Sequence, residues 1–408
     1  MIRSLAWRNV KRSRRRSIIT AILSIMTTTL FIFYVSMMDG SYGKIFKDSV
    51  EIYPGYIQVT HKDYRDEPSN DHLIFNTKEI VEKLKARKDI EYVAQRFESF
   101  ALYATDENSI GGLFTGIEPD IEPELSRVSQ TIKEGRYLLS TDKQEVIIGQ
   151  GLATRLKLKL GDTFSMIGSG ADYSFTADNL KAVGIFKTGL IDFDNSAVFM
   201  NKLYFDELLT TEGASSHIII KPVKTEKSLE LAATLNTAFS AHDEVEVQDW
   251  HEYLSSIIEA MQIDRVSGMI TLWVLIALIF FVVMIYAYLA IYSRTKEVGI
   301  MRAIGTSPKQ IIMVLVTETL IVAGISILIG AVLGGWISYY YQIHPIEFPS
   351  LEETYQQYGI IEAVLPTDFR WSTILEGCGF ILMLNLISVL YPIWQIIRIK
   401  PIDAIHHL

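Results

Sequence analysis

Four long apolar stretches constrain this chain more than any other feature of its sequence. A helix needs about 20 apolar residues to cross the hydrocarbon core of a bilayer. Stretches of that length occur at 18–38, 267–292, 311–337 and 372–394. The first two contain no charged side chain, and the other two contain one acid each, Glu318 and Glu376. Because backbone polar groups in lipid must pair within their own segment, we expect four transmembrane helices.

Charge is distributed unevenly on the two sides of these helices. Residues 1–17 hold seven bases and no acid, and the loop 293–310 and the tail 395–408 are also net basic. Residues 39–266 hold 24 bases and 38 acids, and the loop 338–371 holds one base and five acids. Basic residues near membrane ends mark the cytoplasmic side. We therefore expect both termini in the cytoplasm and residues 39–266 on the outer side.

The basic N-terminus and the first apolar stretch each admit a second interpretation. An Arg cluster also occurs in nucleic-acid-binding arms, but directly before an apolar helix it favours contact with anionic lipid headgroups. The stretch 18–38 is long for the apolar region of a signal peptide, and no small-x-small cleavage site follows it. We expect a retained membrane anchor and no nucleic-acid partner.

Residues 39–266 are long enough to form a large soluble domain. Short runs rich in β-branched and aromatic residues predict strands at 56–60, 100–105, 145–148, 163–167, 182–186 and 217–223. Apolar residues at helical spacing predict amphipathic helices at 77–88 and 225–241. We expect an α+β domain of two lobes, with strands dominating residues 106–216 and βαβ-like material in the flanks. The single cysteine, Cys378, lies outside this domain, which must be stable through its own core.

The stretch 149–163 is the most motif-like part of this domain. It predicts a short amphipathic helix, a turn at Gly161 and a strand, which we interpret as structural. No Gly-x4-Gly-Lys-Ser/Thr sequence occurs in the chain, so we expect no ATP site and no enzymatic activity of its own. The final His406 and His407 are interpreted as ordinary tail residues, and we expect no metal site and no directly bound cofactor.

A second helical pattern directly precedes the stretch 267–292. Residues 249–265 carry an apolar stripe that predicts a helix continuing without a break into the membrane. Its members are Trp250, Tyr253, Leu254, Ile257, Ile258, Met261 and Ile263. Such a helix would connect the outer domain stiffly to a transmembrane helix.

The loop 293–310 and the helix after it carry the most specific sequence. The loop "SRTKEVGIMRAIGTSPKQ" predicts either a simple basic turn or a short helix at 295–304 along the membrane surface. In the stretch 311–337 we expect a structural or gating role for the intramembrane acid Glu318. The same stretch contains small residues that permit close helix contact, within one chain or between two copies. These are Gly324, Gly330, Gly334 and Gly335.

The stretch from 294 to 335 resembles the signature of the FtsX/MacB-type (type VII) ABC transporter permeases. The matching positions are Arg294, Thr295, Glu297, Gly299, Arg302, Ala303, Gly305, Glu318, Gly330, Gly334 and Gly335. In the tail, Arg398, Pro401 and Ala404 resemble the closing motif of the family. The resemblance implies a permease of the bacterial inner membrane with a MacB-like periplasmic core domain between its first two helices.

The resemblance also implies partners and a mechanism. In this family the loop is a coupling helix for a separate ATPase, which implies that an ATPase dimer contacts Arg294, Glu297, Gly299, Arg302 and Gly305. ATP and Mg²⁺ then belong to that partner. Two permeases, identical or paralogous, pair with each other, and ATP-driven closure moves their outer domains, a mechanism called mechanotransmission.

Three subfamily functions are compatible with the sequence. The segments "SMMDGSYGKIF" and "GQGLATRLKLKLGDT" resemble the lipoprotein-releasing LolC/LolE group. That resemblance implies lipoprotein release, with a possible periplasmic chaperone partner and lipid chains held near Met37, Met38, Ile257 and Met261. The end of the second helix is closer to MacB-type permeases, which export peptides or small molecules. The third function is FtsX-like regulation of cell-wall hydrolases.

Overall fold

The structure is a computed structural model that describes residues 7–8, 10, 14–75, 77–239, 244–292, 295–348 and 364–398. It separates into two units. One consists of residues 1–43, 261–347 and 364–408, and we call it the helical unit. The other consists of residues 44–260 and 348–363, and we call it the sheet domain.

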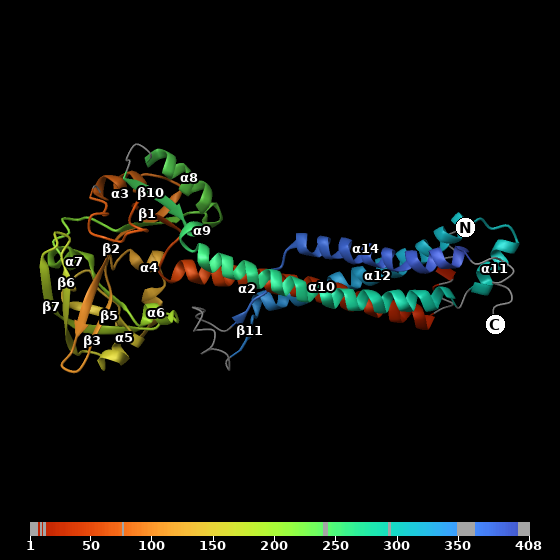
Figure 1. Cartoon of the computed structure of the whole chain (residues 1–408), viewed down its shortest axis with the longest axis horizontal. Coiled ribbons are helices and arrows are strands. Elements are labelled where there is room, and N and C mark those ends of the chain that lie inside the picture. The colour runs from red at the N-terminus through yellow and green to blue at the C-terminus, as the bar shows by residue number, and fades with distance from the viewer. Residues whose placement is uncertain are drawn as a thin grey trace. The chain divides into compact units, whose positions relative to one another are not determined.

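Long helices make up the helical unit (Figure 1). They are α2 (Arg14–Ile52), α10 (Ser255–Tyr292), α12 (Pro308–Ile343) and α14 (Trp371–Arg398), with the short α11 (Thr295–Ala303) between α10 and α12. The four long helices have the length and hydropathy needed to cross a membrane, which confirms the expected number of spans. A two-stranded pair, β11 (Ile346–Glu347) and β12 (Val364–Leu365), precedes α14. The last residues of α2 and the first residues of α10 belong to the sheet domain.

One part of the sheet domain is a four-stranded sheet with two helices. Its elements are β1 (Ile57–His61), α3 (Thr77–Lys85), β2 (Ile90–Ala104), β9 (His217–Pro222), α8 (Ser228–Phe239) and β10 (Val245–Asp249). The strand order is β10-β1-β9-β2 with antiparallel neighbours, which is the split βαβ arrangement. The apolar faces of α3 and α8 pack with the strands in one core, which includes Leu84, Ile218 and Leu235.

The residues between β2 and β9 build the other part, a small closed barrel. Its further strands are β3 (Ser109–Ile117), β5 (Glu145–Gly149), β6 (Thr163–Ser169), β7 (Phe175–Phe186) and β8 (Ala197–Asn201). The ring β2-β3-β8-β5-β7-β6 closes because β6 pairs with both β7 and β2. Closure leaves these strands without free edges. Phe97, Phe114 and Phe164 are buried in its core.

Short elements surround this barrel. They are α4 (Glu122–Leu125), η1 (Val128–Thr131), β4 (Ile132–Gly135), α5 (Gln150–Leu156), α6 (Ile191–Asp194), α7 (Lys202–Leu208), η2 (Thr225–Lys227) and α9 (Trp250–Tyr253). The expected α+β domain of two parts is confirmed, and its strand-dominated middle is the barrel. The stretch 149–163 has the expected helix, α5, and a turn in which Gly161 adopts a φ of +91°.

The expected helix does continue without a break into the second span, as α10, but its start at residue 249 is wrong because the first residues form a separate helix. Asp249 caps the separate helix α9 by accepting the His251 N–H at 3.1 Å. Leu254 then leaves the helical conformation, with φ −101° and ψ 20°, and α10 begins at Ser255. The Trp250 N–H donates to the Tyr56 carbonyl at 3.0 Å. The Trp250 N–H is one of the first donors of α9, which have no partner within the helix, so this bond holds α9 on the sheet domain.

Candidate functional site

The segment between α10 and α12 folds as a short helix between two defined turns. The Thr295 hydroxyl donates to the Tyr292 carbonyl at 2.6 Å, where α10 ends. Gly305 follows α11 with a φ of +101°, a conformation that glycine adopts without strain. Ser307 then caps α12 in a reciprocal capping box with Gln310. These local signals determine where the flanking helices end and start, and therefore where α11 lies in the sequence.

One side of α11 is buried against the ends of α12 and α14. Val298 is 5% exposed and belongs to an apolar cluster with Ile311, Leu315, Val389 and Ile393. Burying a side chain of this size contributes about 1.5–3 kcal/mol. A force applied to α11 therefore acts on α12 and α14 through packing as well as through the chain.

The other side of α11 is exposed and combines charge with apolar surface. Lys296, Glu297 and Ile300 are exposed, and Ile304, just after the helix, is 81% exposed. Residues 296, 300 and 304 are four apart and lie on one face of a helix. An exposed apolar row flanked by charges is the usual character of a surface that a partner covers.

The structure describes four of the five predicted ATPase-coupling residues. Glu297 is exposed, Arg302 is half-buried and Gly299 is buried in the packed side of α11. Gly305 is exposed and supplies the left-handed turn. Arg294 lies outside the described residues, as do Pro401, Ala404, His406 and His407 of the tail. A contact of these residues with an ATPase remains a prediction.

The glycines of α12 confirm the expected packing interface and assign it to the inside of the chain. A Cβ added at Gly330 would lie 2.8 Å from the Ile25 carbonyl oxygen, and one at Gly334 would lie 3.2 Å from the Thr29 Cα. The Thr29 hydroxyl also donates to the Gly330 carbonyl at 3.2 Å. These contacts bring the backbones of α2 and α12 together, whereas Gly324 faces open space. 

Two further predictions fall on the helical unit. Glu318 is half-buried on α12, and its structural or gating role remains a prediction. Of the proposed lipid-cavity residues, Met38 is buried and lies against α10, where a Cβ on Gly268 would be 3.1 Å from the Met38 Cε. Met37 and Met261 are half-buried. Ile257, also half-buried, belongs to the sheet domain, and the cavity itself remains a prediction.

The end of α2 is fixed to the sheet domain by a charged cluster that sequence reasoning missed. Arg127 lies beside Asp48 at 3.0 Å and also pairs with Glu51. The Arg127 N–H donates to the Glu51 carbonyl at 2.8 Å, and the Tyr56 hydroxyl donates to the Glu51 carboxylate at 2.7 Å. Val50 is buried in the core of the four-stranded part. The last turn of α2 is therefore an integral part of the sheet domain.

The start of α10 is attached to the same region through α9. The Trp250 ring lies 5.4 Å from the Phe46 ring of α2, and the Tyr253 hydroxyl donates to the Gly55 carbonyl. Burial raises the pKa of Tyr253 well above its usual value, with Asp249 adding to the effect, so its hydroxyl stays protonated as a donor. Both helices that enter the sheet domain are thus held by side chains of this domain.

A buried guanidinium lies beside this attachment. Arg96 of β2 donates to the Tyr53 carbonyl at 2.6 Å and to the Glu122 carboxylate at 2.5 and 3.0 Å. Burial on its own lowers the pKa of Arg96, but the Glu122 carboxylate outweighs it and keeps the pKa above its usual range. The sequence signal is a basic residue within a strand-like stretch, next to Phe97, which sequence reasoning did not use.

Two protein-family models match this chain. Residues 17–238 match the MacB-like periplasmic core domain, and residues 269–401 match the FtsX-like permease C-terminal family. The lipoprotein-releasing system transmembrane protein LolC of Neisseria meningitidis serogroup B is 22% identical over 397 residues, covering 93% of this chain and 91% of the relative. An uncharacterized ABC transporter permease of Methanocaldococcus jannaschii is 23% identical over 346 residues, covering 81% of this chain and 82% of the relative.

Among solved structures, the periplasmic region of MacB from Actinobacillus actinomycetemcomitans is similar. It is 15% identical, with a TM-score of 0.38, and the match covers 53% of this chain and 98% of that structure. The family assignment rests on the sequence matches. The periplasmic-core match spans more than half of the chain, and the permease match takes in α11 and the packed glycines of α12. This chain is a member of the FtsX/MacB-type family of ABC transporter permeases.

Proposed function

We propose that this permease transmits the ATP-driven motion of a separate ATPase, docked on α11, to the sheet domain. The observation that carries the proposal is the two-sided character of α11. Its exposed side offers Lys296, Glu297, Ile300 and Ile304, and its buried side packs through Val298 on α12 and α14. An ATPase that held the exposed side would move the long helices through the buried side.

The route from the long helices to the sheet domain is the attachment described above. α2 and α10 each contribute residues to both units. Arg127 holds the last turn of α2, and Trp250 and Tyr253 hold the segment before α10. A displacement of either helix therefore acts on the sheet domain through hydrogen bonds and packing, which is the content of mechanotransmission.

The proposal includes an orientation and an assembly. Both termini and α11 lie in the cytoplasm, the sheet domain lies outside it, and the chain pairs with a second permease, identical or paralogous. ATP and Mg²⁺ are bound by the ATPase dimer.

The orientation is tested with an impermeant maleimide on intact cells. Single cysteines are placed at the exposed positions Lys296 and Lys83 in a Cys378→Ala background. Lys83→Cys should react from outside and Lys296→Cys only after lysis; the reverse pattern refutes the orientation.

Coupling is tested with the permease and its ATPase reconstituted in nanodiscs. Because burial of an isoleucine side chain contributes about 1.5–3 kcal/mol, Ile304→Asp should weaken ATPase binding about 10- to 100-fold. Glu297→Lys should also reduce permease-dependent ATPase activity. Glu79→Lys is the matched control, since it makes the same charge change on the exposed surface of α3. Unchanged binding and activity in both α11 variants would refute the docking site.

For the substrate, we propose lipoproteins to be released from the inner membrane of a bacterium. LolC is the name of a relative that matches nearly the whole chain, although the archaeal permease is equally similar in sequence. The test is mass spectrometry of molecules that co-purify with the permease–ATPase complex trapped without ATP. Triacylated lipoproteins support release. Peptides or small molecules in their place would favour MacB-like export, and a co-purifying cell-wall hydrolase would favour FtsX-like regulation.

A further inference from the structure

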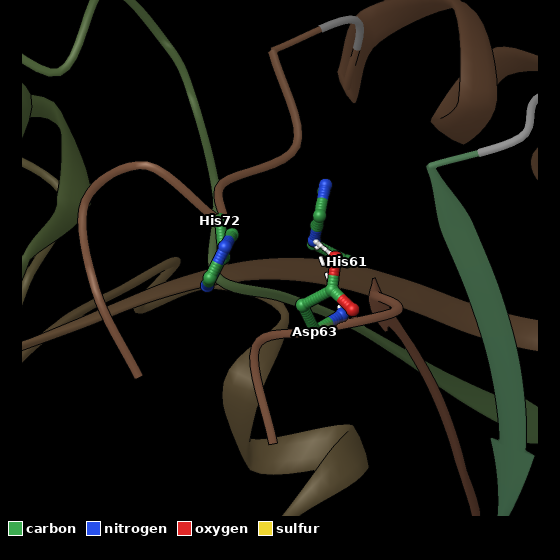
Figure 2. Close-up of side chains that lie close together, drawn as sticks. All are labelled: His61, Asp63 and His72. Carbon is green, nitrogen blue, oxygen red and sulfur yellow. Dashed lines mark hydrogen bonds and ion pairs between the residues drawn. The ribbon is translucent and has the colours of Figure 1, made fainter. Parts of the chain in front are cut away.

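Two histidines and an aspartate meet at the loop that follows β1. His61 is the last residue of β1, and Asp63 and His72 belong to the loop that follows it. One ligand atom from each residue lies within 4.8 Å of the other two. Figure 2 shows the Asp63 carboxylate directed at His61 and the two imidazole rings facing one another. The ring centroids are 5.0 Å apart.

Hydrogen bonds define which nitrogen of each ring carries a lone pair. The His72 Nδ1 lies 2.8 Å from the Glu67 carbonyl oxygen, which only accepts, so Nδ1 carries the proton and Nε2 the lone pair. The His61 Nδ1 accepts the Asp63 N–H at 3.2 Å, so its lone pair is on Nδ1. A carbonyl that holds Nδ1–H is the usual partner of a histidine that ligates a metal through Nε2.

Two acceptors then face each other without a proton between them. The lone pair on the His61 Nδ1 lies 3.8 Å from Oδ2 of Asp63. A cation would take the place of the Asp63 N–H at the single lone pair of the His61 Nδ1 and would bond to the Asp63 carboxylate as well. Ligand atoms around a tetrahedral Zn²⁺ are about 3.3 Å apart, given bond lengths of about 2.0–2.1 Å. The observed separation therefore requires a movement of only about half an ångström along this edge.

We propose that His61, Asp63 and His72 bind a divalent transition-metal ion of the Zn²⁺ type. Two imidazole nitrogens and one carboxylate oxygen form a zinc donor set, with a fourth position left for water. The rings are stacked with an interplanar angle of 15°, so their lone pairs do not converge on one point until one ring moves. His72 and Glu67 lie on the same loop and would move together, which keeps the bond between the His72 Nδ1–H and the Glu67 carbonyl.

The ion would join the two ends of the loop 62–71. This loop supplies Tyr64, Arg65, Ser69 and Asn70 to the wall of a cavity of about 380 Å³ that also reaches Glu98 and His217. The metal site thus sets the position of one cavity wall. No metal site was expected from the sequence, in which only His406 and His407 were considered as metal ligands.

The test uses the full-length chain in detergent, purified on a tag without histidine. A His406→Ala/His407→Ala background removes the two consecutive histidines of the tail, which could bind Zn²⁺ themselves. Zn²⁺ binding is measured by calorimetry and by metal analysis after dialysis. We expect one Zn²⁺ per chain. His72→Gln and Asp63→Asn should each weaken Zn²⁺ binding at least about 100-fold. Loss of a residue that only hydrogen-bonds to a metal ligand typically weakens binding about 10- to 100-fold. His251→Gln is the matched control, since His251 also contacts an aspartate, Asp249.

Trypsin provides a second measurement that does not depend on affinity. Lys62 and Arg65 are exposed cleavage sites in the loop. Zn²⁺ should slow cleavage there in the parent protein and in His251→Gln, but not in His72→Gln. Absence of a bound Zn²⁺, or equal binding and protection in His72→Gln and the parent, would overturn the site.

Discussion

The sheet domain and the helical unit bury their polar side chains in different ways. The sheet domain buries charged side chains, and some of them are paired, such as Arg96 with Glu122 at 1% exposure each. Among the described residues of the helical unit, every buried polar side chain is uncharged. Several of these hydroxyls bond to a carbonyl four residues earlier in their own helix, as Thr28 does to Ser24 and Ser326 to Val322.

The difference follows from the surroundings of each region. A hydroxyl bonded within its own helix needs no partner from elsewhere, so it costs little in a segment that lies in lipid. The helical unit is therefore held together by shape, with glycines that bring backbones close. The sheet domain depends on specific long-range pairs, and removing one partner leaves the other charge buried without compensation. Substitutions in the sheet domain should therefore destabilise by removing the partner of a buried charge. Substitutions in the helical unit should destabilise by steric overlap.

The largest effect is expected from Arg96→Met in the sheet domain. The substitution leaves the Glu122 carboxylate buried without its partner, which should cost about 3–5 kcal/mol. Hydrogen exchange of the β2 amides, measured by mass spectrometry on the full-length chain, reports this loss. Arg87→Met is the control, because Arg87 and Asp89 form an exposed pair worth about 1 kcal/mol or less. Equal effects of the two substitutions would contradict the role assigned to the buried pair.

The next effect is expected from Gly330→Leu in the helical unit. Its Cβ would overlap the backbone of α2 at Ile25, and forcing a side chain into a packed interface costs about 1–3 kcal/mol. We expect a lower thermal midpoint of the detergent-solubilised chain. Gly324→Leu, on the same helix with nothing within 4 Å of its Cβ, should leave the midpoint unchanged. If Gly324→Leu destabilises as strongly, helix propensity or lipid contact explains the effect and packing on α2 does not.

The parts of this fold that the sequence predicted are those determined by neighbours in the chain. The four spans follow from uninterrupted apolar runs, whereas the sequence left open whether residues 295–304 form a simple turn or the short helix α11. The barrel was not predicted, because its closure depends on β6 pairing with β2 and β7, far apart in sequence. The break at Leu254 was also missed, because the residues on both sides of it keep the apolar spacing of a single helix.

The candidate sites divide in the same way. The glycine interface was recognised from the spacing of small residues, but its partner, α2, was open until the structure placed Thr29 beside Gly330. The attachment of α2 through Arg127 had no local signal, because Asp48 and Glu51 precede it by more than 70 residues. Residues that act through partners distant in sequence can therefore be identified only from the structure.

A smaller effect is expected where the two regions share a helix. Arg127→Gln removes the pairs with Asp48 and Glu51, but Arg127 is 28% exposed, so solvent screens part of the loss. We expect the amides of residues 44–52 to lose about 1–2 kcal/mol of protection against hydrogen exchange, while the packed middle of α2 is unaffected. Lys47→Gln is the control, because Lys47 is 61% exposed and 4.0 Å from Glu51. A uniform loss along α2 would show that Arg127 stabilises the whole helix and does not act as a local attachment.

The smallest effect is a pH dependence confined to the sheet domain. His217 is half-buried beside the Tyr64 ring, and desolvation lowers its pKa, although the Glu98 carboxylate opposes the shift. Below its unfolded pKa of about 6.5, the unfolded chain binds a proton that folded His217 resists. The free energy of unfolding should therefore fall as the pH drops below about 6.5, by at most about 1.4 kcal/mol per pH unit.

Substitution of this histidine isolates its share of the pH dependence. His217→Gln should flatten the dependence of β9 amide protection between pH 7 and 5.5, whereas His251→Gln, at a half-exposed side chain, should not. The window stops at pH 5.5 because burial raises the pKa of Asp194, which stabilises the folded state as it takes up a proton at lower pH and so acts in the opposite direction. If the pH dependence of β9 protection survives in His217→Gln, another group causes it. The pH dependence would then no longer distinguish the sheet domain from the helical unit through His217.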